Sequence, residues 1–191
     1  MRKLIVVLLC MLALFAVVSC NNEPQTVVDD NPGSGEPEWD TGTLLIKPGE
    51  GCVWGGNQDR FQFYVNVDQP LAANDVVSFL VKLSDSFEKI VPRSSNSTSS
   101  YVKFSTLPLA SLEQDDDGWY IVSVTATEAC DYLGITCMLK SDAVQSEDLY
   151  VAIIDMEINE SPVDFDSIDG DAAIPFGGAA NPDKITAIIT E

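Results

Sequence analysis

The chain has 191 residues, and its 30 Asp and Glu residues outnumber its 10 Lys and Arg residues, which gives a formal net charge of −20 at pH 7. Such an acidic surface repels nucleic-acid phosphates, and the basic residues do not cluster along the sequence, so we expect no nucleic-acid binding. The chain contains no histidine, which excludes Ser-His-Asp and Cys-His catalytic pairs, HExxH zinc sites and an imidazole pH switch. Carboxylates are the main acid–base groups that remain, and no pair of them stands out, so we expect a protein that is not an enzyme.

The first twenty residues have the order of a secretory signal peptide. Arg2 and Lys3 precede an unbroken apolar run over residues 4–18, and a small residue, Ser19, stands before Cys20. A helix needs about 20 apolar residues to cross a bilayer, and this run is shorter. The sequence therefore predicts export and favours a cleaved signal over a permanent membrane span.

The end of this segment, Val17-Val18-Ser19-Cys20, resembles the lipobox of bacterial lipoproteins. The resemblance implies that residues 1–19 are removed as a signal peptide, that a diacylglycerol is attached to the thiol of Cys20, and that the new amino terminus is acylated. An ordinary signal peptide cut nearby and an uncleaved anchor are the alternatives. Acyl chains contribute about 0.8 kcal/mol per buried methylene, so several of them would hold the protein on a membrane.

Residues 20–40 contain Asn, Glu, Asp, Pro, Gly and Ser with few apolar side chains. Such a composition buries too little surface to offset the entropy of ordering, so we predict a flexible, lipidated tether. Lipoproteins of the Bacteroides group often begin in this way, and acidic residues directly after their cysteine send them to the outer face of the outer membrane. Glu23 is the only early acid here, so the resemblance implies an outer-membrane anchor and leaves the surface and periplasmic faces open.

Regular structure is expected from Thr41 to Asn159. Between Arg60 and Val67, apolar and polar residues alternate, and this period of two indicates a strand with one buried face. Turn-forming residues separate further short apolar runs, and no helical period is evident, which predicts an all-β fold with one core, a β-sandwich. We predict strands over residues 43–47, 60–67, 75–83, 87–91, 101–105, 119–127, 134–140 and 149–154.

Two stretches of this region resemble immunoglobulin and fibronectin type III domains. Residues 116–120, Asp-Asp-Gly-Trp-Tyr, resemble the tyrosine-corner pattern, and residues 134–142 with 146–153 resemble a final hairpin. The resemblance implies an immunoglobulin-like β-sandwich over residues 41–159. It would lack the inter-sheet disulfide, because the strand at residues 60–67 contains no cysteine.

The folded region contains three cysteines, Cys52, Cys130 and Cys137, and an odd number cannot pair completely. Cys130 and Cys137 flank a turn-like stretch and could form a disulfide across it. The sequence favours the alternative, in which Cys137 is a small core residue on the apolar side of a strand, because free cysteines are usually buried.

Residues 160–191 form an acidic and then Gly-Ala-rich tail that ends on a strand-like run at residues 185–189. Either this run folds back as a last edge strand, or the chain is the front part of a longer protein. A cluster of carboxylates around Gly170 resembles a calcium loop, with a solvated acidic loop as the alternative. The carboxylates are Asp164, Asp166, Asp169 and Asp171. No other cofactor is expected.

Aromatic residues provide the candidate ligand site. Trp54 stands in a Gly-rich loop with Asn57, Gln58 and Asp59, and a sugar ring could stack on the indole while the amides and the acid bind its hydroxyl groups. The alternative is that Trp54 packs on the core. Trp39, in the tether, could dock against the domain.

These features predict an exported, lipid-anchored protein of a bacterial membrane. We expect it to be a non-enzymatic binding module for a glycan or a protein ligand, with the membrane as its partner through the lipid anchor. The alternative is a structural or assembly subunit that pairs with another subunit through a sheet edge or the C-terminal strand. A small carbohydrate-active enzyme that uses carboxylates alone is a further, less favoured alternative.

Overall fold

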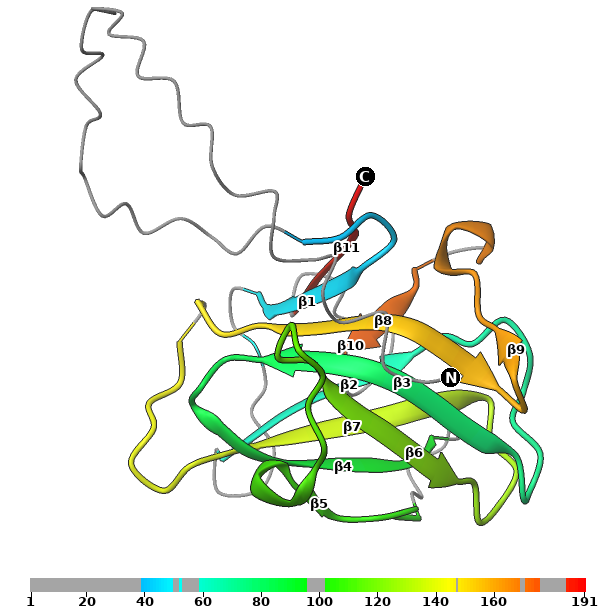
Figure 1. Cartoon of the computed structure of the whole chain (residues 1–191), viewed down its shortest axis with the longest axis horizontal. Coiled ribbons are helices and arrows are strands. Elements are labelled where there is room, and N and C mark those ends of the chain that lie inside the picture. Colours follow the sequence, from blue (N-terminus) through cyan, green and yellow to red (C-terminus); the bar gives the residue numbers. More distant parts are fainter. Residues whose placement is uncertain are drawn as a thin grey trace, which may run out of the picture. The chain divides into compact units, whose positions relative to one another are not determined.

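The computed structural model describes residues 39–49, 52, 59–95, 102–146, 148–168, 171–175 and 185–191. In these residues the strands form two antiparallel sheets, seen as two layers in Figure 1. Apolar side chains on alternate positions of the longer strands face the opposite sheet, so the core lies between the layers.

We call the two layers sheet A and sheet B. Sheet A has the order β11-β1-β8-β3-β6, with β9 pairing β8. Its strands are β1 (Leu44–Pro48), β3 (Val76–Leu83), β6 (Tyr120–Thr125), β8 (Val151–Ile158), β9 (Ser161–Pro162) and β11 (Ile185–Ile189). Sheet B has the order β10-β2-β7-β4-β5. Its strands are β2 (Arg60–Val65), β4 (Phe87–Ser95), β5 (Leu107–Pro108), β7 (Tyr132–Leu139) and β10 (Ala173–Pro175). Two 3₁₀ turns, η1 (Leu109–Ser111) and η2 (Phe165–Ser167), join strands.

The connections define the type of sandwich. Between β1 and β8, every connection except that from β4 to β5 crosses from one sheet to the other. The order β1-β8-β3-β6 against β2-β7-β4-β5 is the double Greek key of a jelly roll. The predicted all-β sandwich is confirmed. Its strand order is that of a jelly roll, whereas an immunoglobulin domain, which the resemblance implied, keeps its first two strands in one sheet.

The tail contributes to both sheets. β11 pairs with β1 in antiparallel register, from Leu44 opposite Ile189 to Pro48 opposite Ile185, and β10 pairs with β2. The run at residues 185–189 is therefore an edge strand, and the sandwich includes strands from beyond Asn159, where the sequence pattern ended it.

One predicted strand, at residues 101–105, is wrong. Tyr101 lies outside the described residues, and in the described remainder of that range only Lys103 makes an isolated bridge, to Arg93 of β4. The ladder beside β4 is instead formed by β5. The other predicted strands are present, with ends shifted by up to four residues.

Aromatic and branched side chains fill the core. Phe61 and Phe63 of β2 are fully buried and lie 5.3 Å apart, between their ring centroids. Cys137 of β7 is also fully buried in this core, as predicted, and it forms no disulfide with Cys130. Burial raises the pKa of the Cys137 thiol, so this cysteine behaves as a small apolar residue.

Candidate functional site

The structure describes four of the residues predicted from the sequence to form sites: Asp59, Asp164, Asp166 and Asp171. Cys20, Trp54, Asn57, Gln58 and Asp169 lie outside the described residues, so their predicted roles stay predictions.

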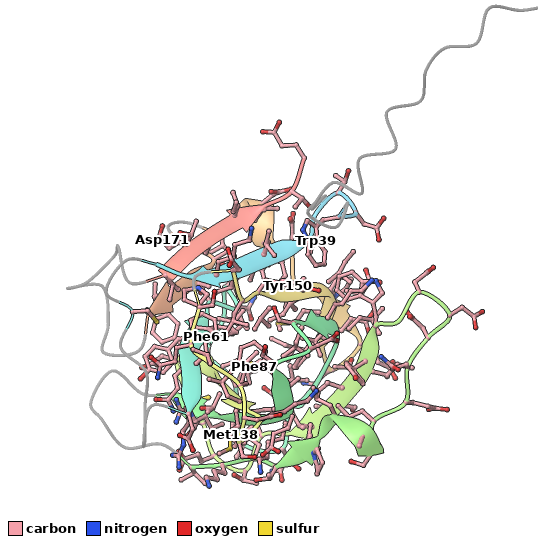
Figure 2. All side chains as sticks on the ribbon, turned by 90° about the vertical axis from the view of Figure 1, so that its left-hand side faces the viewer. Trp39, Phe61, Phe87, Met138, Tyr150 and Asp171 are labelled. Carbon is pink, nitrogen blue, oxygen red and sulfur yellow. The ribbon has the colours of Figure 1, made fainter. Side chains whose placement is uncertain are left out.

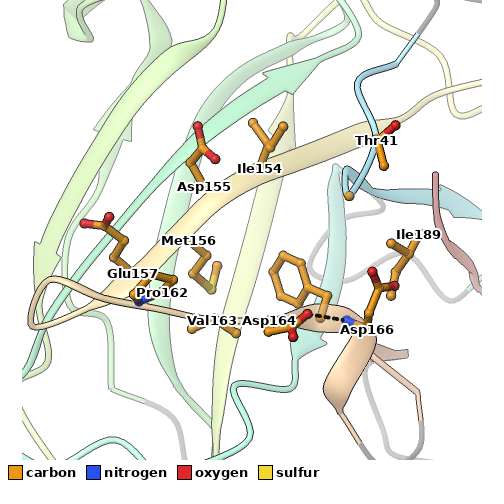
Figure 3. A pocket seen from close by; sticks show the side chains of 12 residues that line it. Thr41, Ile154, Asp155, Met156, Glu157, Pro162, Val163, Asp164, Asp166 and Ile189 are labelled. Carbon is orange, nitrogen blue, oxygen red and sulfur yellow. Dashed lines mark hydrogen bonds between the residues drawn. The ribbon is translucent and has the colours of Figure 1, made fainter. Parts of the chain in front are cut away.

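Asp164 and Asp166 line a cleft of about 410 Å³ beside β8. Figure 3 shows their side chains across the cleft from Asp155 and Glu157. The Asp164 carboxylate accepts a hydrogen bond from the backbone N–H of Asp166, at 3.1 Å, and so caps η2. Asp171 is exposed and is not among the residues that line the cleft.

A β-bulge in β8 shapes this cleft. The pairing of β8 with β3 shifts by one residue between Ile154 and Glu157, and Asp155 has a φ of +52°. A bulge of this kind bends the strand and re-aims the side chain of the extra residue.

Within the described residues, no three Asp, Glu or Cys side chains are grouped so that they could hold a metal ion. A calcium site needs several oxygen ligands that converge on one point. Asp164 and Asp166 therefore do not form such a site with the other described acids, and the calcium loop stays a prediction that depends on Asp169.

A second cleft, of about 400 Å³, shares Pro162, Val163 and Asp164 with the first. Asp75 lies in it and accepts hydrogen bonds from Asn159 Nδ2, at 2.8 Å, and from the backbone N–H of Ala72, at 2.7 Å. These two bonds, the first being the larger cause, lower the pKa of the Asp75 carboxyl.

The outer face of sheet B contains a different kind of site. Because side chains alternate along a strand, β2 presents Gln62 and Tyr64 on the face opposite to its buried Phe61 and Phe63. A small pocket of about 70 Å³ opens on this outer face, and we call it the Arg93 pocket. It is lined by Arg60, Gln62, Val91, Arg93, Lys103, Thr136 and Met138.

A buried polar network forms the base of the Arg93 pocket. Gln62, Arg93 and Thr136 are 6%, 2% and 4% exposed. With its amide oxygen turned toward Arg93, Gln62 accepts hydrogen bonds from both terminal guanidinium nitrogens, at 3.2 and 3.1 Å, and from the Thr136 hydroxyl, at 3.2 Å. A guanidinium has only donors, which fixes this orientation of the amide.

The absence of a side chain at Gly134 of β7 leaves space for the Arg93 side chain. A Cβ at this position would lie 2.9 Å from Cγ and 3.2 Å from Nε of Arg93. Gly134 pairs with Arg93 on one side and with Tyr64 on the other. The arginine side chain therefore passes directly over the glycine, which matches the use of strand glycines where another group approaches the backbone closely.

Two tyrosines continue the same face. The rings of Tyr64 and Tyr132 are stacked, with centroids 6.3 Å apart and an interplanar angle of 26°. Both side chains are half-buried. We call them the tyrosine pair.

Asp59, the described member of the predicted aromatic loop site, adjoins the Arg93 pocket. Its carboxylate lies 3.2 Å from Nε of Arg60, and the two side chains are 40% and 35% exposed. Asp59 directly precedes β2, and the sequence did not reveal the Arg93 pocket as a site. A signal was present, because Gly134 interrupts an otherwise apolar strand.

The outer face of sheet A carries an aromatic cluster of its own. The Trp39 ring packs edge-on against Tyr150, at 5.0 Å between centroids, and against Trp119, at 6.1 Å. Nζ of Lys82 lies 5.6 Å from the Trp119 ring. We call these four residues the Trp39 cluster. Burial, and then the charge of Asp85, raise the pKa of the Tyr150 hydroxyl. The predicted docking of Trp39 on the domain is confirmed.

No protein-family model, no curated protein and no solved structure matches this chain. In the part of the chain that the structure describes, no helix has the length and apolar character needed to cross a bilayer. Function must therefore be argued from the residues themselves.

Proposed function

We propose that this chain is an exported, lipid-anchored binding protein of a bacterial outer membrane, and that its jelly-roll domain binds a carbohydrate on the outer face of sheet B. The anchor is proposed from the lipobox-like segment that ends at Cys20. The binding role is proposed from the side chains of this face, and it needs no catalytic step.

The observation that carries the proposal is the tyrosine pair beside the Arg93 pocket. Sugar rings stack their apolar faces on aromatic rings, while their hydroxyl groups need donors and acceptors nearby. Here the tyrosine rings supply the stacking surface, and Gln62, Arg93 and Thr136 supply donors and acceptors already held in place by one another. Such preorganisation lowers the entropy cost of binding.

The position of the face supports this role. Trp39 docks on sheet A, so the chain enters the sandwich on that side. In Figure 2, Trp39 and Tyr150 lie together on one side of the sandwich, and Met138, from the Arg93 pocket, lies on the opposite side. The sheet B face therefore lies opposite the face on which Trp39 docks. Jelly rolls also occur in lectin domains, which supports the proposal by analogy of fold alone.

A binding assay on the full mature protein tests this function. We expect Tyr64→Ala and Tyr132→Ala each to weaken binding to any carbohydrate found on a glycan array by up to about tenfold, because aromatic ring stacking contributes about 0.5–1.5 kcal/mol. Tyr150→Ala, the same change on sheet A, is the matched control and should leave the affinity unchanged. Absence of binding to every carbohydrate of the array would refute the proposal.

The lipid anchor has a separate test. Mass spectrometry of the protein purified from its native membrane should find a diacylglyceryl group on Cys20, and Cys20→Ser should release the protein from the membrane fraction. An unmodified Cys20 thiol in membrane-bound protein would contradict the anchor without affecting the binding proposal.

The position of β11 favours a second candidate function, assembly through a sheet edge. β11 lies at the edge of sheet A, and Ile188 in it is 52% exposed. Edge strands can pair with a strand of another subunit. Oligomers of the full mature protein that dissociate on Ile188→Lys would favour this candidate, whereas a monomer in light scattering would exclude self-assembly through this edge.

A further inference from the structure

We infer that the carbohydrate bound by the sheet B face carries a carboxylate, as a uronic-acid-containing glycan does, and that the Arg93 pocket receives this group. The inference rests on the proposed function and concerns the class of ligand.

Charge is the first observation. Of the 10 Lys and Arg residues in the chain, Arg2 and Lys3 lie in the signal segment, and three of the other eight line the Arg93 pocket. These three are Arg60, Arg93 and Lys103, and the described lining residues include no carboxylate. The chain as a whole has a net charge of −20, so the charge of the side chains that line this pocket is opposite in sign to the charge of the chain.

The remaining acidic surface does not cancel this local field. At physiological ionic strength the Debye length is about 8 Å, so exposed charges farther away are largely screened. A carboxylate in the pocket would therefore experience mainly the three cations that line it and the carboxylate of Asp59, which lies 3.2 Å from Nε of Arg60.

Size is the second observation. A cavity must have a volume of at least about 10–15 Å³ to hold one water molecule. The Arg93 pocket, at about 70 Å³, therefore holds only a few groups of that size. Pockets that enclose a whole small molecule measure about 300–1,000 Å³. The pocket therefore suits one substituent of a sugar, such as a carboxylate, while the ring stays outside it.

The tyrosine pair lies where that ring would be. Tyr64 follows Gln62 by two residues on the same face of β2, which is a separation of about 7 Å along the strand. This is close to the width of one sugar ring with its substituent. A uronate with its carboxylate in the pocket would thus extend over the tyrosine pair.

The three cations differ in their positions. Arg93 is buried at the base and is held by Gln62, so its planar guanidinium has a fixed orientation. Lys103 is exposed at the rim. Arg60 is paired with Asp59, but an exposed ion pair of this kind is weak, so a ligand carboxylate can compete for Arg60.

The test uses a panel of uronate oligosaccharides and, for each one, the same oligosaccharide with its carboxyl groups reduced to alcohols. We expect the full mature protein to bind at least one uronate oligosaccharide at least about tenfold more tightly than its reduced counterpart. Lys103→Gln should remove most of this preference. Lys82→Gln, which removes a charge on the outer face of sheet A, is the matched control and should leave the preference unchanged.

The outcomes separate this inference from the proposed function. Equal affinity for acidic and reduced oligosaccharides, or binding to neutral glycans only, would overturn the carboxylate inference and leave carbohydrate binding intact. Binding to no carbohydrate at all would refute both. A preference for the uronate that Lys103→Gln and Lys82→Gln reduce equally would overturn the assignment to this pocket. Equal binding of an oligoglutamate peptide would overturn the inference that the carboxylate belongs to a carbohydrate.

Discussion

On the outer face of sheet A, Trp119 and Tyr150 hold Trp39 of the same chain, whereas on the outer face of sheet B the tyrosine pair lies beside a network of polar side chains. Both faces combine aromatic rings with a cation. The first uses them to fix the segment where the chain enters the sandwich, and the second presents them next to a pocket. The same surface chemistry therefore holds Trp39 on sheet A and, under the proposed function, binds a ligand on sheet B.

The residues between the rings explain the difference. Around the Trp39 cluster, the outer face of sheet A carries Leu45, Ala152 and Ile154, which favour burial beneath an indole. The outer face of sheet B instead has the polar residues Gln62, Arg93 and Thr136, which are also buried. Buried polar groups cost free energy unless they are hydrogen-bonded, and even a satisfied buried network is weak grounds for stability. The presence of this network motivates the proposed ligand site on sheet B.

Trp119→Ala removes a ring of the Trp39 cluster on sheet A, and we expect it to lower the stability of the fold more than any other variant proposed here. Trp119 is 6% exposed, and truncation of a buried Trp to Ala costs about 3–5 kcal/mol. For a folded unit of about 150 residues, we expect the melting temperature to fall by roughly 10 °C. Thermal unfolding followed by circular dichroism measures the change.

Tyr64→Ala is the contrasting variant for this experiment, because it removes a half-buried ring from sheet B. It should lower the melting temperature much less than Trp119→Ala. An equal loss of stability in both variants would show that the tyrosine pair is structural, and the contrast between the two faces would then fail.

Part of this organisation can be predicted from the sequence. The alternation in residues 60–67 gives both the strand and its faces, since Phe61, Phe63 and Val65 are all fully buried. The turn before β6 was also predictable. The Asp115 carboxylate accepts from the N–H groups of Asp117 and Trp119, at 3.0 and 2.8 Å, as acidic turn residues commonly do.

The rest depends on contacts that local patterns do not encode. β1 pairs with β11, which lies about 140 residues later in the chain, and the jelly-roll order follows from such distant pairings. The strand predicted at residues 149–154 ends at Ile154, whereas β8 continues through a bulge to Ile158. β10 was missed because it is short and ends on Pro175, which an edge strand tolerates.

The Arg93 pocket could not be predicted for a similar reason. Arg93 follows Val91-Pro92 at the start of a polar run, and arginine is seldom buried. Its burial arises from Gln62 and Thr136, on two other strands. Only Gly134 marks the site within its own strand.

Gly134→Ala tests the Arg93 pocket on sheet B, and we expect it to change ligand affinity and stability by an intermediate amount. The added Cβ would meet Arg93 Cγ at 2.9 Å, so the arginine must leave its position over β7. We expect affinity for a uronate oligosaccharide to fall about tenfold, equivalent to about 1.4 kcal/mol. Overpacking should also lower the free energy of unfolding by about 1–3 kcal/mol.

A double-mutant cycle with Arg93→Ala identifies the cause. In the Arg93→Ala background, Gly134→Ala should have little further effect on stability or binding, because the side chain that it displaces is gone. If the two changes are additive, Gly134 acts independently of Arg93, and the pocket geometry described above does not control binding.

Lowering the pH should change the contribution of the carboxylate network in the second cleft to the free energy of unfolding, and should leave the contribution of the polar network of sheet B unchanged. We expect this to be the smallest of the effects. The pKa of Asp75 is lowered in the folded state by its bonds with Asn159 and with the backbone of Ala72. A carboxyl with a lowered folded pKa stabilises the fold above its unfolded pKa, 3.8, and loses this contribution as the pH falls through the folded pKa. Arg93, Gln62 and Thr136 do not titrate in this range.

Urea unfolding of the wild type and of Asp75→Asn measures this contribution. The wild type should be the more stable of the two at pH 6, and the difference should shrink as the pH falls below 3.8. Comparison with Asp75→Asn removes the effects of the other acids, which titrate in both proteins. Because Asp75 lies near the solvent, the difference is small, and a difference that stays constant down to pH 2.5 would contradict the role of its charge. Gln62→Leu should show that constant difference, since its network carries no group that changes charge over these pH values.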